Sequence, residues 1–247
     1  MKPLFILKLL SCLTLTTVPG FAAEPSAYLE DQATVQDLRS LYTGYKPFYL
    51  VAQKLPIPGR PPTQEQSDKE SLGLVLLNNR QTPLLTQFTQ REDSLVGWIY
   101  LFYSEEKDPA YYPKTKLVIE KTLADLNAFY LPYALTYKRS PPGIENNRLK
   151  MPIQTRFNYT FPCLPSAQTR IALAIMEELN GTSLKEANEY YKAMLQRRLI
   201  YALNYPSDLA EANALAANVW KAIQSSEAFQ ADLANAKTEW KWRTTLR

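Results

Sequence analysis

The sequence of 247 residues contains no histidine. Histidine is the side chain whose charge changes most readily near neutral pH, and it is the commonest general acid or base in enzymes. Its absence excludes Ser-His-Asp and Cys-His catalysis, zinc sites with histidine ligands, and chemistry through a phosphohistidine. The chain therefore lacks the usual group for proton transfer at neutral pH.

Glycine and cysteine are also scarce. There are seven glycines, with no GxGxxG and no GxxxxGK[ST] motif, which excludes the glycine-rich loops that bind nucleotide phosphates. The two cysteines are Cys12 and Cys163, so no internal disulfide can form if Cys12 is removed with a leader. Cys163 lies between two prolines and has no histidine partner. We interpret it as a small buried residue, with a reactive thiol as the alternative.

The N-terminal segment has the layout of a secretory signal peptide. Lys2 and Lys8 accompany a short apolar run, and small residues follow it. This pattern predicts a signal peptide over residues 1–23 and hence a periplasmic or secreted protein. An N-terminal membrane anchor and a lipoprotein through Cys12 are the alternatives. No other run approaches the roughly 18 apolar residues of a membrane span, so no transmembrane segment is expected in the mature chain.

Charge and composition restrict the partners. The net charge of +4 falls to about +2 without the leader, and the charges are dispersed, which argues against a nucleic-acid surface. Apolar residues make up 46% of the chain, enough for a sizeable core. No cofactor or metal site is predicted. Tyrosine is abundant, with 16 residues, which favours a protein contact surface.

Apolar residues recur at helical spacing along the chain, and no segment shows the alternation of a strand. The sequence therefore predicts an all-α protein with a single helical domain. The expected parts are the signal peptide 1–23, an N-terminal helix and Pro-rich arm over 24–66, and a helical domain over 67–247. Helices are predicted over residues 31–44, 67–79, 93–103, 113–139, 166–180, 183–202, 209–223 and 227–242.

Several local signals define the ends of these helices. Pro132 is expected to kink the helix 113–139, because proline removes a backbone hydrogen bond. Gly181 is expected to end the helix 166–180, and Ser183 with Glu186 is expected to start the next one as a capping box. Residues 140–165 contain five prolines and are predicted to form a long loop.

Two polar clusters about thirty residues apart mark a candidate site. Ser166 begins a predicted helix, where free backbone N–H groups attract anions. Arg198 lies near the end of the next helix, and Asp208 opens the helix after that. If these helices pack side by side, Ser166, Arg198 and Asn204 face one anion-binding pocket. The alternative is that Ser166 and Asp208 are helix caps and that Arg197 and Arg198 form a solvated face.

The clusters resemble motifs of the class A bacterial nonspecific acid phosphatases. That family belongs to the phosphatidic acid phosphatase type 2 superfamily, which also contains the vanadium haloperoxidases. Its motif Pro-Ser-Gly-His is similar to Pro165-Ser166-Ala167-Gln168, and its motif Ser-Arg-x5-His-x3-Asp is similar to Arg197-Arg198-x5-Asn204-x3-Asp208, with the spacing kept. The resemblance covers residues 113–242, including a similar last helix, and it implies a single helical domain of the acid phosphatase / haloperoxidase type. The remaining motif, Lys-x6-Arg-Pro, aligns its Lys with Ala134 and its Arg with Pro141.

The resemblance implies that the catalytic groups have been replaced. The histidine that forms the phosphohistidine is Asn204 here, and the histidine that protonates the leaving group is Gln168. Neither amide can act as a nucleophile or proton donor in place of an imidazole. Ala134 and Pro141 replace two cations that hold the phosphate, which removes charge stabilisation of the transition state. No catalytic residue is therefore expected at these positions.

Some parts of the family's phosphate site remain. The resemblance leaves Arg198, Ser166 and the backbone N–H groups near Ala167 as anion-binding candidates, together with Asp208, which would orient the nucleophile in the family. Lys138 or Arg139 could take the place of the missing cations. With its orienting role lost, Asp208 is expected to serve as a helix cap.

These observations predict an exported pseudoenzyme that binds phosphate, another small anion, or a protein partner. One alternative is an acid phosphatase with residual or altered activity. Its candidate groups would be Asp208, Glu177, Glu178 and Tyr201, although the two glutamates are more typical of a solvated helix end. Another alternative is a structural subunit of an envelope assembly, which a lipid on Cys12 would suit.

Overall fold

The computed structural model describes residues 45–50, 58–83, 112–153 and 159–240. The predicted signal peptide and the predicted helices 31–44 and 93–103 lie outside the described residues. All regular structure in the described ranges is helical, which confirms the predicted all-α single domain. The helices are α4 (Gln64–Asn78), α7 (Pro113–Tyr137), α8 (Pro142–Glu145), α9 (Leu164–Asn180), α10 (Lys185–Ile200), α11 (Pro206–Gln224) and α12 (Glu227–Lys237).

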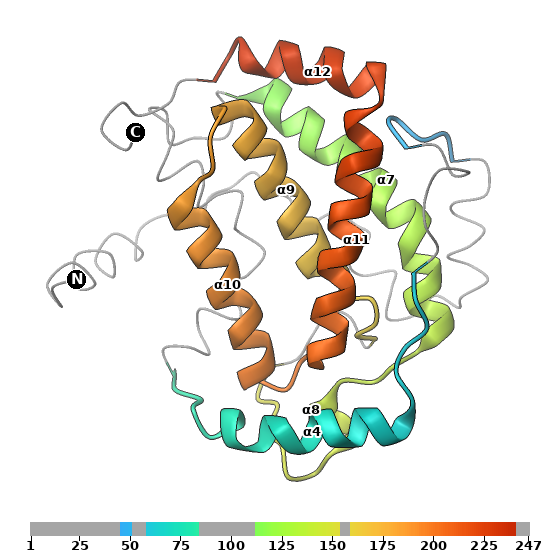
Figure 1. Ribbon diagram of the computed structural model, residues 1–247, viewed down its shortest axis with the longest axis vertical. Helices are drawn as coiled ribbons and strands as arrows, with labels where there is room; N and C mark the ends of the chain where they lie inside the picture. The colour runs from blue at the N-terminus through green and yellow to red at the C-terminus, as the bar shows by residue number, and fades with distance from the viewer. Residues whose placement is uncertain (1–44, 51–57, 84–111, 154–158, 241–247) are drawn as a thin grey trace, which may run out of the picture.

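Helix α9 forms the centre of the domain. It lies between α10 and α11 with α7 behind it, and it contacts these three helices and α12 (Figure 1). The predicted apolar face from Ile171 to Leu179 is buried, but so are Leu173 and Ala174, because neighbours surround the helix. Gly181 ends α9 with a φ of 74°, as predicted, since a left-handed residue without a Cβ is tolerated there.

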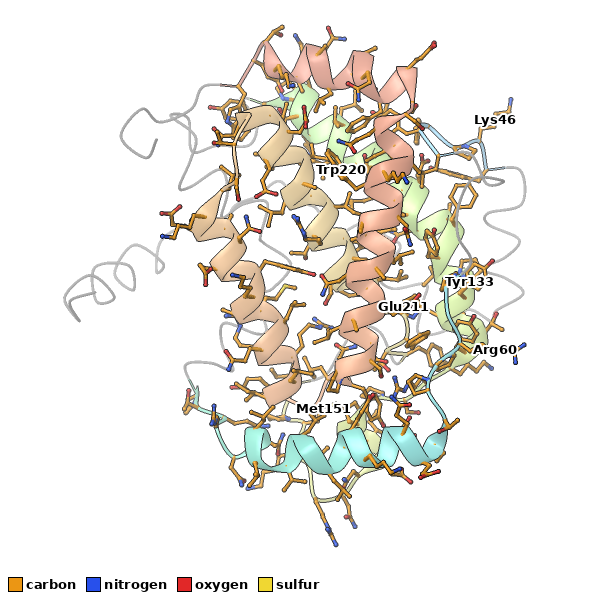
Figure 2. All side chains as sticks on the ribbon, in the orientation of Figure 1. Lys46, Arg60, Tyr133, Met151, Glu211 and Trp220 are labelled. Atoms are coloured by element: carbon orange, nitrogen blue, oxygen red, sulfur yellow. The ribbon has the colours of Figure 1, made fainter. Side chains whose placement is uncertain are left out.

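Two helices lie at opposite ends of the domain. Helix α12 lies across one end of α9 and α11, and α4 lies across the ends of α10 and α11 on the other side (Figure 1). The side chain of Asn78 in α4 donates to the carbonyls of Lys150 and Ile200 at 2.9 Å and accepts from the Lys150 N–H at 2.8 Å. Met151 lies between α4 and the end of α10 (Figure 2). Helix α4 is thereby fixed to the end of α10 that leads toward α11.

Four predicted helix starts were wrong, one of them that of α11, which begins at Pro206 rather than residue 209. Helix α4 begins at Gln64 rather than residue 67, because Thr63 caps it and accepts from the Gln66 N–H at 3.4 Å. Helix α9 begins at Leu164 rather than residue 166, since proline fits the first turn of a helix. Helix α10 begins at Lys185 rather than residue 183, and Leu184 is the residue that precedes it.

The predicted extents of α7 and of the segment after it need correction. Helix α7 contains Pro132 and ends at Tyr137, rather than at residue 139. The segment 140–165, predicted to be a loop, contains the short helix α8. Among the described residues, no helix is both long and apolar enough to cross a membrane.

One piece of the Pro-rich arm is held by a buried carboxylate of α7. Asp125 is fully buried and accepts hydrogen bonds from the N–H groups of Phe48, Tyr49 and Leu50 and from the Tyr45 hydroxyl, at 2.7 to 2.9 Å. Consecutive backbone N–H groups on one carboxylate form charge-assisted hydrogen bonds, which are stronger than neutral ones. The segment 45–50 is therefore anchored although it has no helix or strand of its own.

A second piece of the arm, residues 58–63, leads directly into α4. The N–H of Gly59 donates to Glu211 Oε1 of α11 at 3.0 Å. Figure 2 shows Glu211 on α11 and Tyr133 on α7 in the same region as Arg60 of the arm. This contact holds the segment before α4 against the start of α11, where the predicted site residues also lie.

Candidate functional site

The junction between α10 and α11 brings three predicted site residues into contact. Arg198 Nε donates to Asn204 Oδ1 at 2.7 Å. The Asn204 amide nitrogen donates to the Thr160 carbonyl at 3.3 Å and lies 3.5 Å from Asp208 Oδ2. Asn204 is only 1% exposed. Both polar atoms of this amide are thus used inside the protein.

Asp208 is the third residue of α11 and is fully buried. Its Oδ2 accepts the Tyr205 N–H at 2.8 Å, which satisfies a backbone donor just before the helix. Its Oδ1 accepts from Arg139 Nη1 at 2.6 Å. Burial raises the pKa of Asp208, while the charge of Arg139 and hydrogen bonds from Tyr205, Thr160 and Arg139 act against that rise. Asp208 therefore both caps α11 and pairs with Arg139.

Arg139 reaches this junction from the segment after α7, whereas Lys138 is exposed in a left-handed conformation with a φ of 49°. The Arg139 guanidinium lies 3.9 Å from the centre of the Tyr205 ring. Besides Asp208, it donates to Ser207 Oγ at 2.7 Å, to Ser67 Oγ at 2.9 Å and to Glu70 Oε2 at 3.4 Å. Burial raises the pKa of Tyr205 to about 12, so its hydroxyl stays protonated at neutral pH.

The charges around Arg139 do not favour a phosphate. Two carboxylates, Asp208 and Glu70, face one guanidinium. With both carboxylates ionised, Asp208, Glu70 and Arg139 together carry a net negative charge. Adding the charge of Arg198, which lies next to Asn204, brings the net charge only to zero. Phosphate sites instead present an excess of positive charge or of free N–H donors.

The start of α9 is also committed to internal contacts. Ser166 and Ala167 are both fully buried. Ser166 Oγ lies 3.1 Å from Cys163 Sγ, and the Ala167 N–H donates to the Cys163 carbonyl at 3.1 Å. Cys163 itself is buried, as predicted. The N–H of Ala167 is therefore not available to an anion.

Tyr191 joins α10 to the start of α9 and to α11. Its hydroxyl donates to Asn213 Oδ1 at 2.8 Å and lies 3.3 Å from the Ser166 carbonyl oxygen. Burial raises the pKa of Tyr191, with Cys163 acting in the same direction and Arg170 and Arg198 acting against it. Tyr191 and Arg198 are two helical turns apart on the same face of α10.

The remaining positions implied by the resemblance are structural. Gln168 Nε2 donates to Asn127 Oδ1 of α7 at 2.7 Å. Ala134 is buried in the main core. Pro141 is buried, and its carbonyl accepts two N–H groups of α8. Amide pairing and packing thus occupy the positions where the family has an acid and two cations.

The carboxylates considered for an alternative enzyme do not gather with Asp208. Glu177 lies eleven residues beyond Ser166 in α9, about 16 Å along the axis at about 1.5 Å per residue. Glu178 pairs with Lys237 of α12 at 3.2 Å. The hydroxyl of Tyr201 donates to the Thr82 carbonyl at 3.0 Å. These groups belong to separate structural contacts.

Glu177 of α9 binds the turn that leads into α10. Its Oε1 accepts from Ser183 Oγ at 2.9 Å, from the Leu184 N–H at 3.2 Å and from Asn188 Nδ2 at 2.6 Å. Burial alone would raise the pKa of Glu177, but these hydrogen bonds and the charge of Arg170 lower it below the ordinary value. The carboxylate therefore stabilises the turn between α9 and α10 in its ionised form.

Replacing Glu177 with glutamine is expected to lower the free energy of unfolding by about 1–2 kcal/mol at about pH 7. Because the folded-state pKa is lowered, the stabilisation is present above the unfolded-state pKa and is lost as the pH falls through the folded-state pKa. Urea unfolding should show the difference from wild type shrinking between about pH 7 and about pH 3. In the exposed Glu178→Gln control we expect little change. A difference that stays constant with pH would contradict this role.

Sequence reasoning missed several residues of the junction. Glu70 and Ser67 come from α4, and Thr160 comes from the segment before α9. Ser207 had a visible signal, because it lies next to Asp208 in the first turn of α11. Among the described residues, no group of three or more His, Cys, Asp or Glu side chains is placed to hold a metal ion.

Comparison with protein-family models gave no match, and comparison with curated proteins gave none either.

Proposed function

We propose that this chain is an exported, acid-phosphatase-like pseudoenzyme that acts by binding a protein partner and not by hydrolysing phosphomonoesters. Export rests on the signal-peptide pattern of residues 1–23. The phosphatase likeness rests on the spacing of the two motifs and on the contact between Arg198, Asn204 and Asp208 that accompanies it.

The proposal rests mainly on the hydrogen bonds of Asn204. In the resemblance this position holds the nucleophile, whereas here a buried amide donates to the Thr160 carbonyl and accepts from Arg198. An amide nitrogen has no nucleophilic lone pair, and this one is already a donor. A phosphoryl group therefore has no acceptor at this position.

A protein ligand suits the surface better than a small anion. The cation at the junction, Arg139, already pairs with Asp208 and Glu70. Large apolar side chains, in contrast, are exposed on the arm and on α4, α7 and α8: Phe48, Leu72, Leu76, Leu117 and Ile144. Aromatic and aliphatic side chains of this kind are typical of protein contact surfaces.

Hydrolysis of p-nitrophenyl phosphate tests the proposal. The mature chain, residues 24–247, should show no turnover above the buffer blank from about pH 4 to 8. Serine proteases that lack their catalytic triad retain about 10³–10⁴-fold acceleration through binding and polarisation, but here two phosphate-binding cations are also replaced. Stopped and continuous assays with high protein concentration would detect a residual rate.

The matched variant is Arg198→Ala. Turnover in wild type that disappears in Arg198→Ala would contradict the proposal and favour an acid phosphatase with altered activity. Equal rates in wild type and Arg198→Ala would indicate a contaminating phosphatase. The hydrolysis would then not be assigned to this chain.

A further inference from the structure

The guanidinium of Arg139, which follows α7, faces the Glu70 carboxylate of α4. Its side chain is 8% exposed and lies at the start of α11. Nη2 donates to Ser67 Oγ and Glu70 Oε2, and Nη1 donates to Ser207 Oγ and Asp208 Oδ1. Its Nε is buried and has no hydrogen-bond partner among the described residues. The guanidinium therefore has donor capacity beyond what its present neighbours use.

Glu70 occupies the position of an anion at a helix N-terminus. Its Oε2 accepts from the hydroxyl of Ser207, the second residue of α11, at 2.7 Å. The same oxygen is 3.4 Å from Arg139 Nη2, longer than the 2.7–2.9 Å typical of a charge-assisted bond. The Glu70 side chain is 15% exposed, so this position borders solvent. Helix N-termini favour negative charge through their free N–H groups and dipole.

We infer that Arg139, Ser67 and Ser207 form a binding site for a small carboxylate, and that the Glu70 side chain is its resident ligand in the folded chain. We call these three residues the Arg139 cradle. A singly charged carboxylate suits the cradle because Asp208 already contributes one negative charge beside Arg139; a carboxylate adds one more, whereas a phosphate dianion would add two. The site differs from the one implied by the resemblance, which centres on Ser166, Arg198 and Asn204.

The cradle adds a second attachment of α4 to the domain, besides the contacts of Asn78. A ligand tethered in the same chain has an effective concentration far above that of free solute, so free carboxylates cannot displace Glu70 from the intact protein. Removing the Glu70 carboxylate should empty the cradle and allow a free carboxylate to replace it. This inference does not depend on whether the protein hydrolyses phosphomonoesters.

Chemical rescue of Glu70→Ala tests the inference. The melting temperature of this variant should rise by about 2–4 °C in formate or acetate at about ten times the dissociation constant, relative to chloride at equal ionic strength. Wild type should show no such rise. Glu70→Gln should show none either, because its amide still fills the space. Glu65→Ala, which removes an exposed carboxylate from the same helix, is the matched control.

Two outcomes would overturn the inference. One is the absence of a carboxylate-specific rise in Glu70→Ala. The other is a rise of the same size in wild type or in Glu65→Ala, which would indicate a general salt effect. If Glu70→Ala does not fold in chloride, refolding yield in formate is the readout, with recovery supporting the cradle and no recovery contradicting it. The hydrolysis assay is a separate measurement, so failure of either proposal can be recognised independently.

Discussion

Replacing Arg139 with alanine should destabilise the protein by about 3–5 kcal/mol. The substitution removes the positive charge that stabilises the ionised form of the fully buried Asp208 carboxylate. It also removes the donors that join α4 to the start of α11 through Ser67 and Glu70. The free energy of unfolding measured in urea at about pH 7 is the readout.

Three further variants make this result specific. Arg148 is exposed, so Arg148→Ala should change the free energy of unfolding by no more than about 0.5 kcal/mol. Arg139→Lys should recover only part of the loss, because an ammonium lacks the planar fork that reaches Asp208 and Ser67 together. Adding Asp208→Asn to Arg139→Ala should recover stability, since it removes the unpaired charge. A loss below about 1 kcal/mol for Arg139→Ala would contradict the proposed role.

Replacing Asp125 with alanine should release the arm segment 45–50 from α7. The substitution removes one hydroxyl and three backbone hydrogen bonds, and it leaves buried N–H groups of Tyr49 and Leu50 without an acceptor. Each unsatisfied buried donor costs about 1–3 kcal/mol, so we expect a loss of about 2–5 kcal/mol. Limited chymotrypsin digestion should then cleave after Phe48 or Tyr49 much faster than in wild type.

The control for this experiment lies on the same helix. Glu120 is a half-exposed residue that pairs with Lys116, one helical turn away. Glu120→Ala should leave the chymotrypsin cleavage rate unchanged. Similar cleavage rates in Asp125→Ala and wild type would show that other contacts, such as the Tyr49 hydroxyl on Asp232, suffice to hold the segment.

The features that sequence reasoning predicted best are local. The apolar face of α9 and its end at Gly181 depend on residues within one helix, and both were predicted correctly. The contact among Arg198, Asn204 and Asp208 spans only ten residues, so the turn between α10 and α11 is enough to form it. Short-range spacing constrains such contacts because few backbone paths connect them.

The features that were missed depend on contacts between distant parts of the chain. Glu70 and Arg139 are 69 residues apart, and Asp125 lies 75 to 80 residues from the arm that it holds. No periodicity or motif in one sequence relates such pairs. The contact of Glu177 with the Leu184 N–H was missed for the same reason, because the carboxylate comes from the previous helix.

Orthovanadate provides the most direct test of the central proposal, that this chain does not bind a phosphoryl group at Arg198 and Asn204. Vanadate resembles the transition state of phosphoryl transfer, and such analogues bind far more tightly than substrates. We predict that millimolar orthovanadate leaves the melting temperature of residues 24–247 unchanged. A rise of about 2–4 °C in wild type that is lost in Arg198→Ala would contradict the claim.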